Sequence, residues 1–276
     1  MFELPELVIL SRQFNQTLKG RTVQSGCLGN APHKFVWYNH SHDEFDQMTL
    51  GKTIGEARAK GRWLFTDLHP GFVLLMGEIG GKMLYHAPGE KPLSKYHLYL
   101  GFTDGSGLSA MTQMWGAYEL FESGTEGERQ YVKGMRPTPL DDEFTPNYLD
   151  TLIDSLIQGE KRSAKSLLTQ DQLIPGLGNA IAQDILFKAR LHPRHILSDL
   201  NPEQRQTLFL AITETVQAII DQGGRYDETD LFGNPGGYTR LMDSKSAGHP
   251  CPKCGILIEK MQYLGGACYF CPSCQL

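Results

Sequence analysis

The sequence lacks a basic N-terminal segment, a long apolar run and an excess of positive charge. Glu3 and Glu6 stand where a secretion signal would carry lysine or arginine, so we expect no signal peptide and a cytoplasmic protein. No apolar run approaches the roughly 20 residues of a membrane span, so we expect no membrane partner. The formal net charge of −5 argues weakly against nucleic acid as a partner, although a local basic patch would be enough to bind it.

Cysteine is also scarce, with six among 276 residues, but four of the six form two CxxC pairs near the end of the chain. Residues 255–270 separate the pairs and are enough for a hairpin that returns the second pair to the first. Two such knuckles predict one zinc ion bound by four thiolates, a structural site because no position remains for water. The alternative is two disulfide bonds. The predicted ligands are Cys251, Cys254, Cys271 and Cys274.

The first half of the chain predicts one helix followed by short strands. Apolar residues recur at helical spacing over residues 5–19, and Gly20 ends this helix. Between Thr22 and Phe121, apolar stretches alternate with turn sequences, which favours a sandwich or a barrel. Two hairpins are predicted, residues 63–68 with 72–76 and residues 97–102 with 108–112.

The second half predicts helices after a linker at residues 134–142. Thr145 is a candidate N-cap, with Pro146 at the first helical position. Asn201, with Gln204 three residues later, predicts a capping box at the start of the last helix. The other helices are predicted over residues 162–170 and from 179 to 192, and a Gly-rich surface loop is predicted over residues 223–248.

One turn between two predicted helices has the properties of a phosphate clamp. Residues 171–179 read DQLIPGLGN, and Gly176 and Gly178 permit a tight turn with backbone close to a ligand. Asn179 is predicted to cap the following helix, whose first N–H groups would attract an anion. Lys165 would add a positive charge. The alternative is a turn that only packs two helices together.

Three segments of this sequence resemble the formamidopyrimidine-DNA glycosylase and endonuclease VIII family. Residues 172–179 (QLIPGLGN) and 184–193 (DILFKARLHP) are similar to its helix–two-turn–helix. Residues 3–6 (ELPE) resemble its N-terminus, and residues 270–275 (FCPSCQ) resemble its terminal zinc finger. The motifs occur in the family's order and cover both ends and the middle of the chain.

The resemblance implies an α+β multidomain protein with DNA in a cleft. We expect an N-terminal β-sandwich with a flanking helix, of the catalytic type, over residues 1–134. A helical helix–two-turn–helix domain that binds DNA is expected over residues 146–225, and a zinc β-hairpin finger over residues 249–276.

The resemblance also implies a catalytic role for the first three residues. In the family, the N-terminal amine attacks the sugar C1′ to form a Schiff base, and the next residue, a glutamate, handles protons. Here Phe2 replaces the family's proline, and we expect Met1 to stay because the residue after it is large. The free amine then moves out by about 3.5 Å of chain. Glu3 is the predicted proton-handling residue, and the nucleophile is either the amine or a water that Glu3 activates.

Further residues match positions that contact DNA in the family. Arg62 stands at a phosphate-binding lysine, Glu78 at an inserted methionine, and Met114 and Trp115 at residues that fill the space left by a flipped base. Trp115 is alternatively a core aromatic residue. Glu6 is predicted to cap the first helix or to pair with Arg12 rather than to take part in catalysis.

These features predict a divergent DNA-repair glycosylase, with or without abasic-site lyase activity. It would be a monomer that acts on damaged or abasic duplex DNA. The alternative is a non-catalytic protein of the same fold that binds damaged or distorted DNA. A third hypothesis keeps the fold with a partner other than DNA, which the acidic net charge favours slightly.

Overall fold

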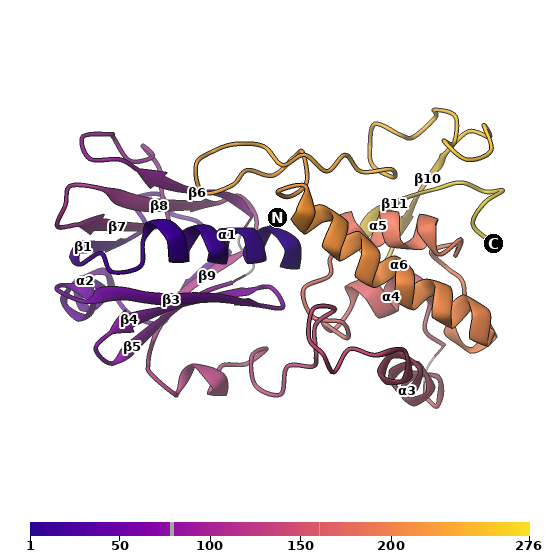
Figure 1. Cartoon of the computed structure of the whole chain (residues 1–276), viewed down its shortest axis with the longest axis horizontal. Coiled ribbons are helices and arrows are strands. Elements are labelled where there is room, and N and C mark those ends of the chain that lie inside the picture. Colours follow the sequence, from indigo (N-terminus) through magenta and orange to yellow (C-terminus); the bar gives the residue numbers. More distant parts are fainter. Residues whose placement is uncertain (78–79, 160) are drawn as a thin grey trace. The chain divides into compact units, whose positions relative to one another are not determined.

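The computed structural model describes residues 1–77, 80–159 and 161–276, and these residues form two compact units (Figure 1). Unit 1 contains Met1–Met135 and Ile220–Tyr238, and unit 2 contains Arg136–Ile219 and Thr239–Leu276. A late segment of the chain therefore folds with the N-terminal residues. Among the helices in the described ranges, none combines the length and the apolar character that a membrane crossing requires.

Unit 1 begins with the predicted helix, α1, which spans Leu4–Thr17. Glu3 is its N-cap residue, and the N–H of Glu3 donates to Oε2 of Glu6 at 3.0 Å. Pro5 lies in the first turn, where the absent N–H has no helical partner to lose. Gly20 follows the helix with a φ of 89°, which favours glycine.

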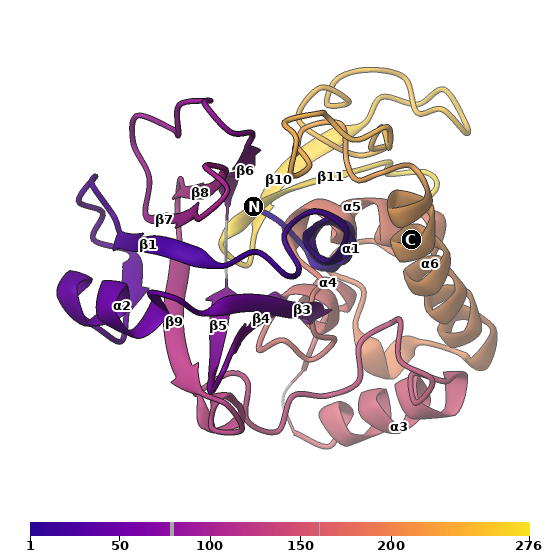
Figure 2. The same cartoon turned by 60° about the vertical axis from the view of Figure 1, so that its left-hand side comes forward.

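Two sheets face each other in unit 1 (Figure 2). One has the order β1-β7-β8-β6 and the other the order β2-β9-β5-β4-β3. The predicted hairpins are confirmed, because β4 pairs with β5 and β7 pairs with β8, both antiparallel. The strands are β1 Val23–Leu28, β2 Val36–Tyr38, β3 Thr53–Lys60, β4 Trp63–His69, β5 Phe72–Gly77, β6 Gly81–His86, β7 Leu98–Phe102, β8 Gly107–Thr112 and β9 Gly116–Glu122.

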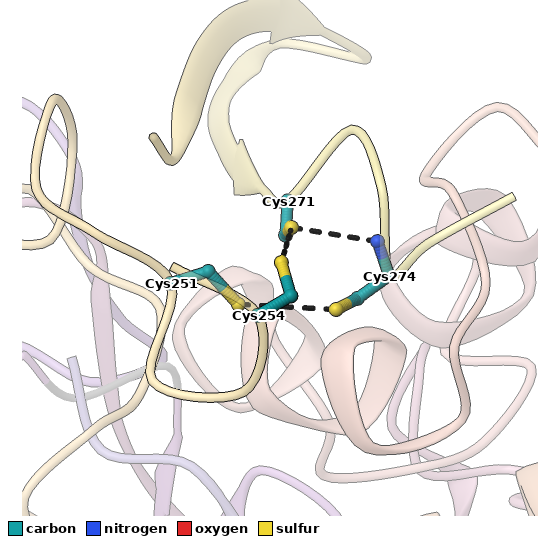
Figure 3. Close-up of side chains that lie close together, drawn as sticks. All are labelled: Cys251, Cys254, Cys271 and Cys274. Carbon is teal, nitrogen blue, oxygen red and sulfur yellow. Dashed lines mark hydrogen bonds between the residues drawn. The ribbon is translucent and has the colours of Figure 1, made fainter. Parts of the chain in front are cut away.

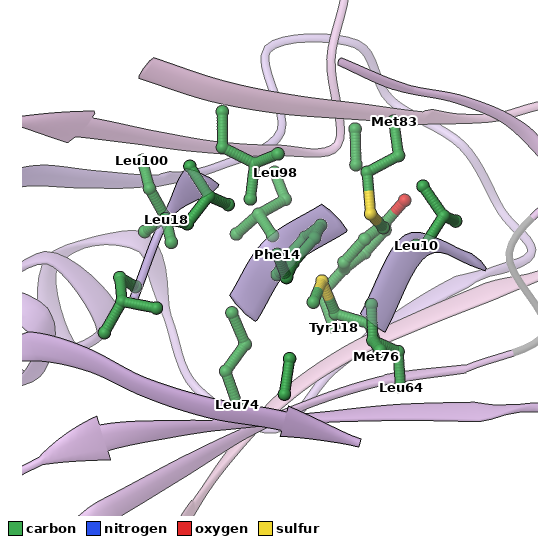
Figure 4. Packing of buried hydrophobic residues seen from close by; sticks show 14 of the residues in the cluster. Leu10, Phe14, Leu18, Leu64, Leu74, Met76, Met83, Leu98, Leu100 and Tyr118 are labelled. Atoms are coloured by element: carbon green, nitrogen blue, oxygen red, sulfur yellow. The ribbon is translucent and has the colours of Figure 1, made fainter. Parts of the chain in front are cut away.

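One hydrophobic core contains side chains of α1 and of both sheets (Figure 4). Leu10, Phe14 and Leu18 come from the helix region and contact side chains of both layers. Burial of each such side chain contributes roughly 1.5–3 kcal/mol, which fixes α1 and the residues before it. A second helix, α2, spans His42–Thr49 and was not predicted, although Ser41 and Glu44 form a capping box there.

Unit 2 contains the helices predicted for the second half of the chain, except that the last two residues of α6 belong to unit 1. Thr145 caps α3 by accepting the N–H of Tyr148 at 3.1 Å, as predicted. The capping box of α6 is also confirmed, since Asn201 and Gln204 exchange hydrogen bonds of 2.9 Å. The helices are α3 Pro146–Ile157, α4 Ala164–Thr169, α5 Asn179–Lys188 and α6 Pro202–Asp221, with short 3₁₀ turns at Glu126–Glu128 in unit 1 and Leu197–Asp199 in unit 2.

The predicted hairpin between the two cysteine pairs is confirmed. Strands β10 (Glu259–Tyr263) and β11 (Gly266–Phe270) pair antiparallel. Residues 223–248 form neither helix nor strand, as predicted. Many of these residues are exposed, as expected of a surface loop, but the side chains of Arg225, Leu231 and Met242 are buried.

Candidate functional site

Five charged groups surround the start of α1, and we name them the N-terminal cluster. They are the α-ammonium of Met1 and the side chains of Glu3, Glu6, Arg225 and Glu228. Arg225 and Glu228 belong to residues 222–238, the post-α6 segment. All five groups lie in unit 1, so a single folded unit builds the cluster.

Arg225 is the centre of the N-terminal cluster and is only 1% exposed. Its Nε donates to Oε1 of Glu6 and its Nη2 to Oε2 of Glu6, each at 2.9 Å. Nη2 also donates to the carbonyl oxygen of Met1 at 2.9 Å, and Nη1 lies 3.8 Å from Oε1 of Glu3. The planar guanidinium suits this arrangement, because its donors form a fixed fork that matches a carboxylate. Arg225 therefore links the first turn of α1 to the terminal residue.

The α-ammonium of Met1 has a carboxylate partner of its own. It donates to Oε1 of Glu228 at 2.6 Å, although 227 positions separate the two residues. Gly80 makes room for the terminal residue, because a Cβ at position 80 would lie 3.0 Å from the Cα of Met1. The terminal amine is thus held by an ion pair, and its backbone by Arg225.

Burial and charge have opposing effects on the acids of the N-terminal cluster. Burial alone would raise the pKa of Glu6, but the charge and hydrogen bonds of Arg225 outweigh it and lower the pKa below its ordinary value. For Glu228 burial prevails over the Met1 ammonium and Arg225, so its pKa is raised. Burial would lower the pKa of Arg225, but Glu6 and Glu3 hold it above its ordinary value. Glu228 is therefore the acid that accepts a proton more readily than Glu6.

The first residues differ in what they offer to a reaction. Glu3 is 4% exposed and stands beside Arg225 in the N-terminal cluster. Phe2 is 1% exposed and packs in the hydrophobic core, so its side chain has a packing role and its nitrogen is an amide. Glu6 takes part in capping α1, as predicted, because its side chain accepts the N–H of the N-cap residue Glu3. The alternative prediction of an ion pair with Arg12 is wrong, because Glu6 pairs with Arg225.

The residues of unit 1 that were predicted to contact DNA lie in connections between strands. Arg62 is half-buried in the turn between β3 and β4. Met114 and Trp115 lie between β8 and β9 and are 57% and 41% exposed. Trp115 stacks on Trp37 with ring centroids 5.4 Å apart. The alternative of Trp115 as a buried core residue is therefore wrong, and Glu78 lies outside the described residues.

In unit 2, the predicted phosphate clamp is joined to the finger hairpin. The N-cap of α5 is Gly178, so the prediction of Asn179 as the cap is wrong, and Asn179 is instead the first helical residue. Its side chain is exposed and its Nδ2 donates to the carbonyl of Ala267 at 3.2 Å. A Cβ at Gly266 would lie 3.1 Å from Oδ1 of Asn179, so the hairpin turn approaches the first turn of α5 closely.

Lys165 was predicted to add a charge to the clamp, but its position gives it another role. It is 1% exposed, and its Nζ donates to the carbonyls of Tyr263 at 2.6 Å and Gly266 at 3.4 Å. A buried ammonium needs such acceptors, because it has lost its hydration. The side chain therefore holds the β10–β11 turn against α4, and its charge is directed at the turn carbonyls.

The four predicted zinc ligands form one cluster (Figure 3). Their sulfur atoms all lie within 4.8 Å of one another, and a tetrahedral zinc with bonds of about 2.3 Å would place its sulfurs about 3.8 Å apart. The N–H groups of Lys253 and Cys274 point at the sulfurs of Cys251 and Cys271, both at 3.4 Å. The donor set and the surrounding N–H groups fit a zinc ion with four thiolate ligands.

Sequence reasoning missed three residues, namely Trp37, which stacks on Trp115, and Arg225 and Glu228 of the N-terminal cluster. The post-α6 segment did carry a signal, because residues 225–230 (RYDETD) are densely charged within a Gly-rich stretch. The partners of Arg225 and Glu228 lie more than two hundred positions away in the chain. The spacing of residues along one sequence does not show such contacts.

Two family profiles match this chain. The formamidopyrimidine-DNA glycosylase N-terminal domain matches residues 1–113, and the formamidopyrimidine-DNA glycosylase H2TH domain matches residues 135–229. The second match ends one residue after Glu228, so it includes both Arg225 and Glu228.

Whole-chain relatives carry the same name. A formamidopyrimidine-DNA glycosylase of Chloroflexus aurantiacus is 30% identical over 281 residues, covering 100% of this chain and 98% of the relative. One from Bacillus cereus is 29% identical over 280 residues, covering 100% and 99%. Among solved structures, Lactococcus lactis Fpg in complex with DNA that contains an abasic site is similar with a TM-score of 0.85 and 25% identity, covering 99% of each chain. The MutM (Fpg) protein of Thermus thermophilus shares the fold, with a TM-score of 0.82 and 24% identity over 99% of this chain and 98% of that chain.

Proposed function

The chain belongs to the formamidopyrimidine-DNA glycosylase family, and from this premise we propose that it is a DNA N-glycosylase with abasic-site lyase activity in base-excision repair. It would act as a monomer on damaged or abasic duplex DNA. The observation that carries the proposal is the N-terminal cluster, because it holds a terminal amine and the buried acid Glu3 together in one unit. These are the two kinds of group that removal of a base through a Schiff base needs.

The chemistry follows from these two groups. The α-amine of Met1 would attack C1′ of the damaged nucleotide after the base has been flipped out of the stack. Glu3 would move protons at the sugar, since its carboxyl is in the same cluster as the amine. Phe2 would take no part in the reaction, because its ring is buried in the core.

Binding of DNA would depend on other residues. Arg62 would contact a phosphate, and the first turn of α5, where Asn179 is exposed, would contact another through its N–H groups. Met114 and Trp115 are exposed apolar side chains that would enter the space left by the flipped base. Lys165 would act indirectly, by holding the β10–β11 turn.

The cysteine cluster would hold a structural zinc ion. Four thiolates complete a tetrahedral site, so the metal would supply folding stability to the finger and no hydrolytic chemistry. Its loss would release the β10–β11 hairpin, which contacts both Asn179 and Lys165.

The test combines two measurements on the purified protein. Intact mass spectrometry establishes whether Met1 is present. Incubation with a duplex carrying a formamidopyrimidine lesion, and with an abasic duplex, in the presence of borohydride then traps any imine. We expect base release and a covalent adduct with Met1. Tight binding without release or adduct would refute the glycosylase and favour the non-catalytic binder.

A further inference from the structure

We propose that Glu228 is a catalytic residue, which positions the α-amine of Met1 and accepts its proton before the amine attacks. This inference rests on the proposed glycosylase function and adds a residue to it. The first support is geometry, because Oε1 of Glu228 lies 2.6 Å from the Met1 nitrogen. Glu228 would thus touch the reacting atom itself.

The second support is that the terminal residue needs positioning. A retained Met1 extends the chain by about 3.5 Å beyond the residue that precedes Glu3, and a terminal residue is ordinarily poorly ordered unless it is tied down. Here the post-α6 segment supplies both ties, Glu228 to the nitrogen and Arg225 to the carbonyl oxygen. Gly80 leaves the space that Met1 occupies. Orientation of a nucleophile in this way lowers the entropy barrier to attack.

The third support is the proton requirement of the reaction. An ammonium has no lone pair, so a proton must leave the Met1 nitrogen before it can form a bond to C1′. Glu228 is in direct hydrogen-bond contact with that nitrogen, and burial raises the pKa of Glu228 despite the facing Met1 ammonium and Arg225. Glu6 also faces Glu228 and raises its pKa further, whereas Glu6 itself is fixed as a carboxylate by Arg225.

The step balances as follows. One proton moves from the Met1 nitrogen to a Glu228 oxygen, and the nitrogen lone pair forms the bond to C1′. The bond from C1′ to the damaged base breaks, and its electron pair leaves on the base, which takes a proton from water. Glu228 returns its proton to the resulting hydroxide and is a carboxylate again.

The experiment measures single-turnover borohydride trapping of the full-length zinc protein on abasic duplex DNA from pH 5.5 to 9.5. The variants are Glu228→Gln, Glu228→Asp and the matched control Asp227→Asn, which removes an equal charge from the neighbouring exposed residue. Affinity for a duplex with an unreactive abasic analogue is measured in parallel, because a merely structural role would change affinity and rate together.

We expect Glu228→Gln to trap about 100-fold more slowly than wild type at neutral pH, with the deficit shrinking at high pH, where hydroxide removes the proton instead. Glu228→Asp keeps a carboxylate and should be faster than Glu228→Gln, while Asp227→Asn and the analogue affinity should match wild type. Trapping by Glu228→Gln that equals or exceeds wild type would overturn the proposal, and faster trapping would mean that the ion pair restrains the amine.

A second variant covers the case in which Glu228→Gln does not fold. Gly80→Ala leaves Glu228 intact but places a Cβ 3.0 Å from the Cα of Met1, so Met1 should shift by a few tenths of an ångström and trapping should slow. Normal trapping by Gly80→Ala would overturn the positioning part of the proposal. If wild type itself releases no base and forms no adduct, the proposed function fails, and that result is distinct from any difference among the variants.

Discussion

Replacing Arg225 with methionine should destabilise unit 1 strongly, and more at neutral than at acidic pH. Methionine keeps most of the volume but leaves the carboxyls of Glu3, Glu6 and Glu228 without the guanidinium that joins them. Removing one partner of a buried ion pair costs roughly 3–5 kcal/mol. With a urea slope of about 2 kcal/mol per M, the unfolding midpoint should fall by about 2 M.

The pH dependence follows from the direction of the Glu6 shift. In wild type the pKa of Glu6 is lowered, so its contribution to stability is present above its unfolded pKa and is lost as pH falls through the lowered value. In the variant the charge and side-chain hydrogen bonds of Arg225 are lost, whereas burial and the backbone N–H bonds from Glu3 and position 225 remain, so the pKa of Glu6 rises above its wild-type value. The unpaired carboxylate of Glu6 in the variant is protonated as pH falls. The difference in the free energy of unfolding between wild type and Arg225→Met should therefore become smaller between pH 7 and about pH 4.

The assay is urea unfolding followed by tryptophan fluorescence. Trp37, Trp63 and Trp115 all belong to unit 1, so the signal reports the unit that contains Arg225. Arg58→Met is the matched control in the same unit, because Arg58 is 47% exposed in its ion pairs and such surface pairs contribute only about 0–1 kcal/mol. The reasoning would be refuted if Arg225→Met lowered the free energy of unfolding by less than about 1 kcal/mol, or if this decrease became larger toward acidic pH.

Three further results are expected. Cys251→Ser should remove zinc measured by metal analysis and weaken binding to abasic-analogue DNA, and a variant that keeps one zinc per chain would refute the predicted ligand set. Lys165→Met should lower the free energy of unfolding by about 1–3 kcal/mol through lost carbonyl contacts but leave the slope of log K for DNA binding against log salt concentration unchanged. Arg62→Ala should make that slope less steep by about one. The opposite pattern in a salt titration would mean that Lys165 contacts DNA phosphate. Trp115→Ala should weaken binding by about 1–3 kcal/mol per lost base stack, and unchanged affinity in an equilibrium titration would exclude insertion of this ring.

Local patterns in the sequence were sufficient to predict most helices and strands. They were insufficient to predict which groups the polar and charged side chains contact. Thr145 and Asn201 marked helix starts because capping depends on residues three positions apart. The two cysteine knuckles marked a metal site because both pairs are short-range patterns. Lys165 and Asn179 were read as phosphate contacts, since the sequence does not show that the hairpin turn supplies carbonyls to both.

From the sequence alone, the altered N-terminus suggests a loss of catalytic activity. The structure shows contacts that hold Met1 and Phe2 in place. The ring of Phe2 is 1% exposed and packs in the core. Removing that ring would cost roughly 3–5 kcal/mol, so Phe2 anchors the residue before it as well as α1. Met1 then ends beside Glu228, with its carbonyl on Arg225 and its Cα against Gly80. These contacts hold the primary amine of Met1 in a defined position, so the buried ring at position 2 and the charged post-α6 segment both position the first residue.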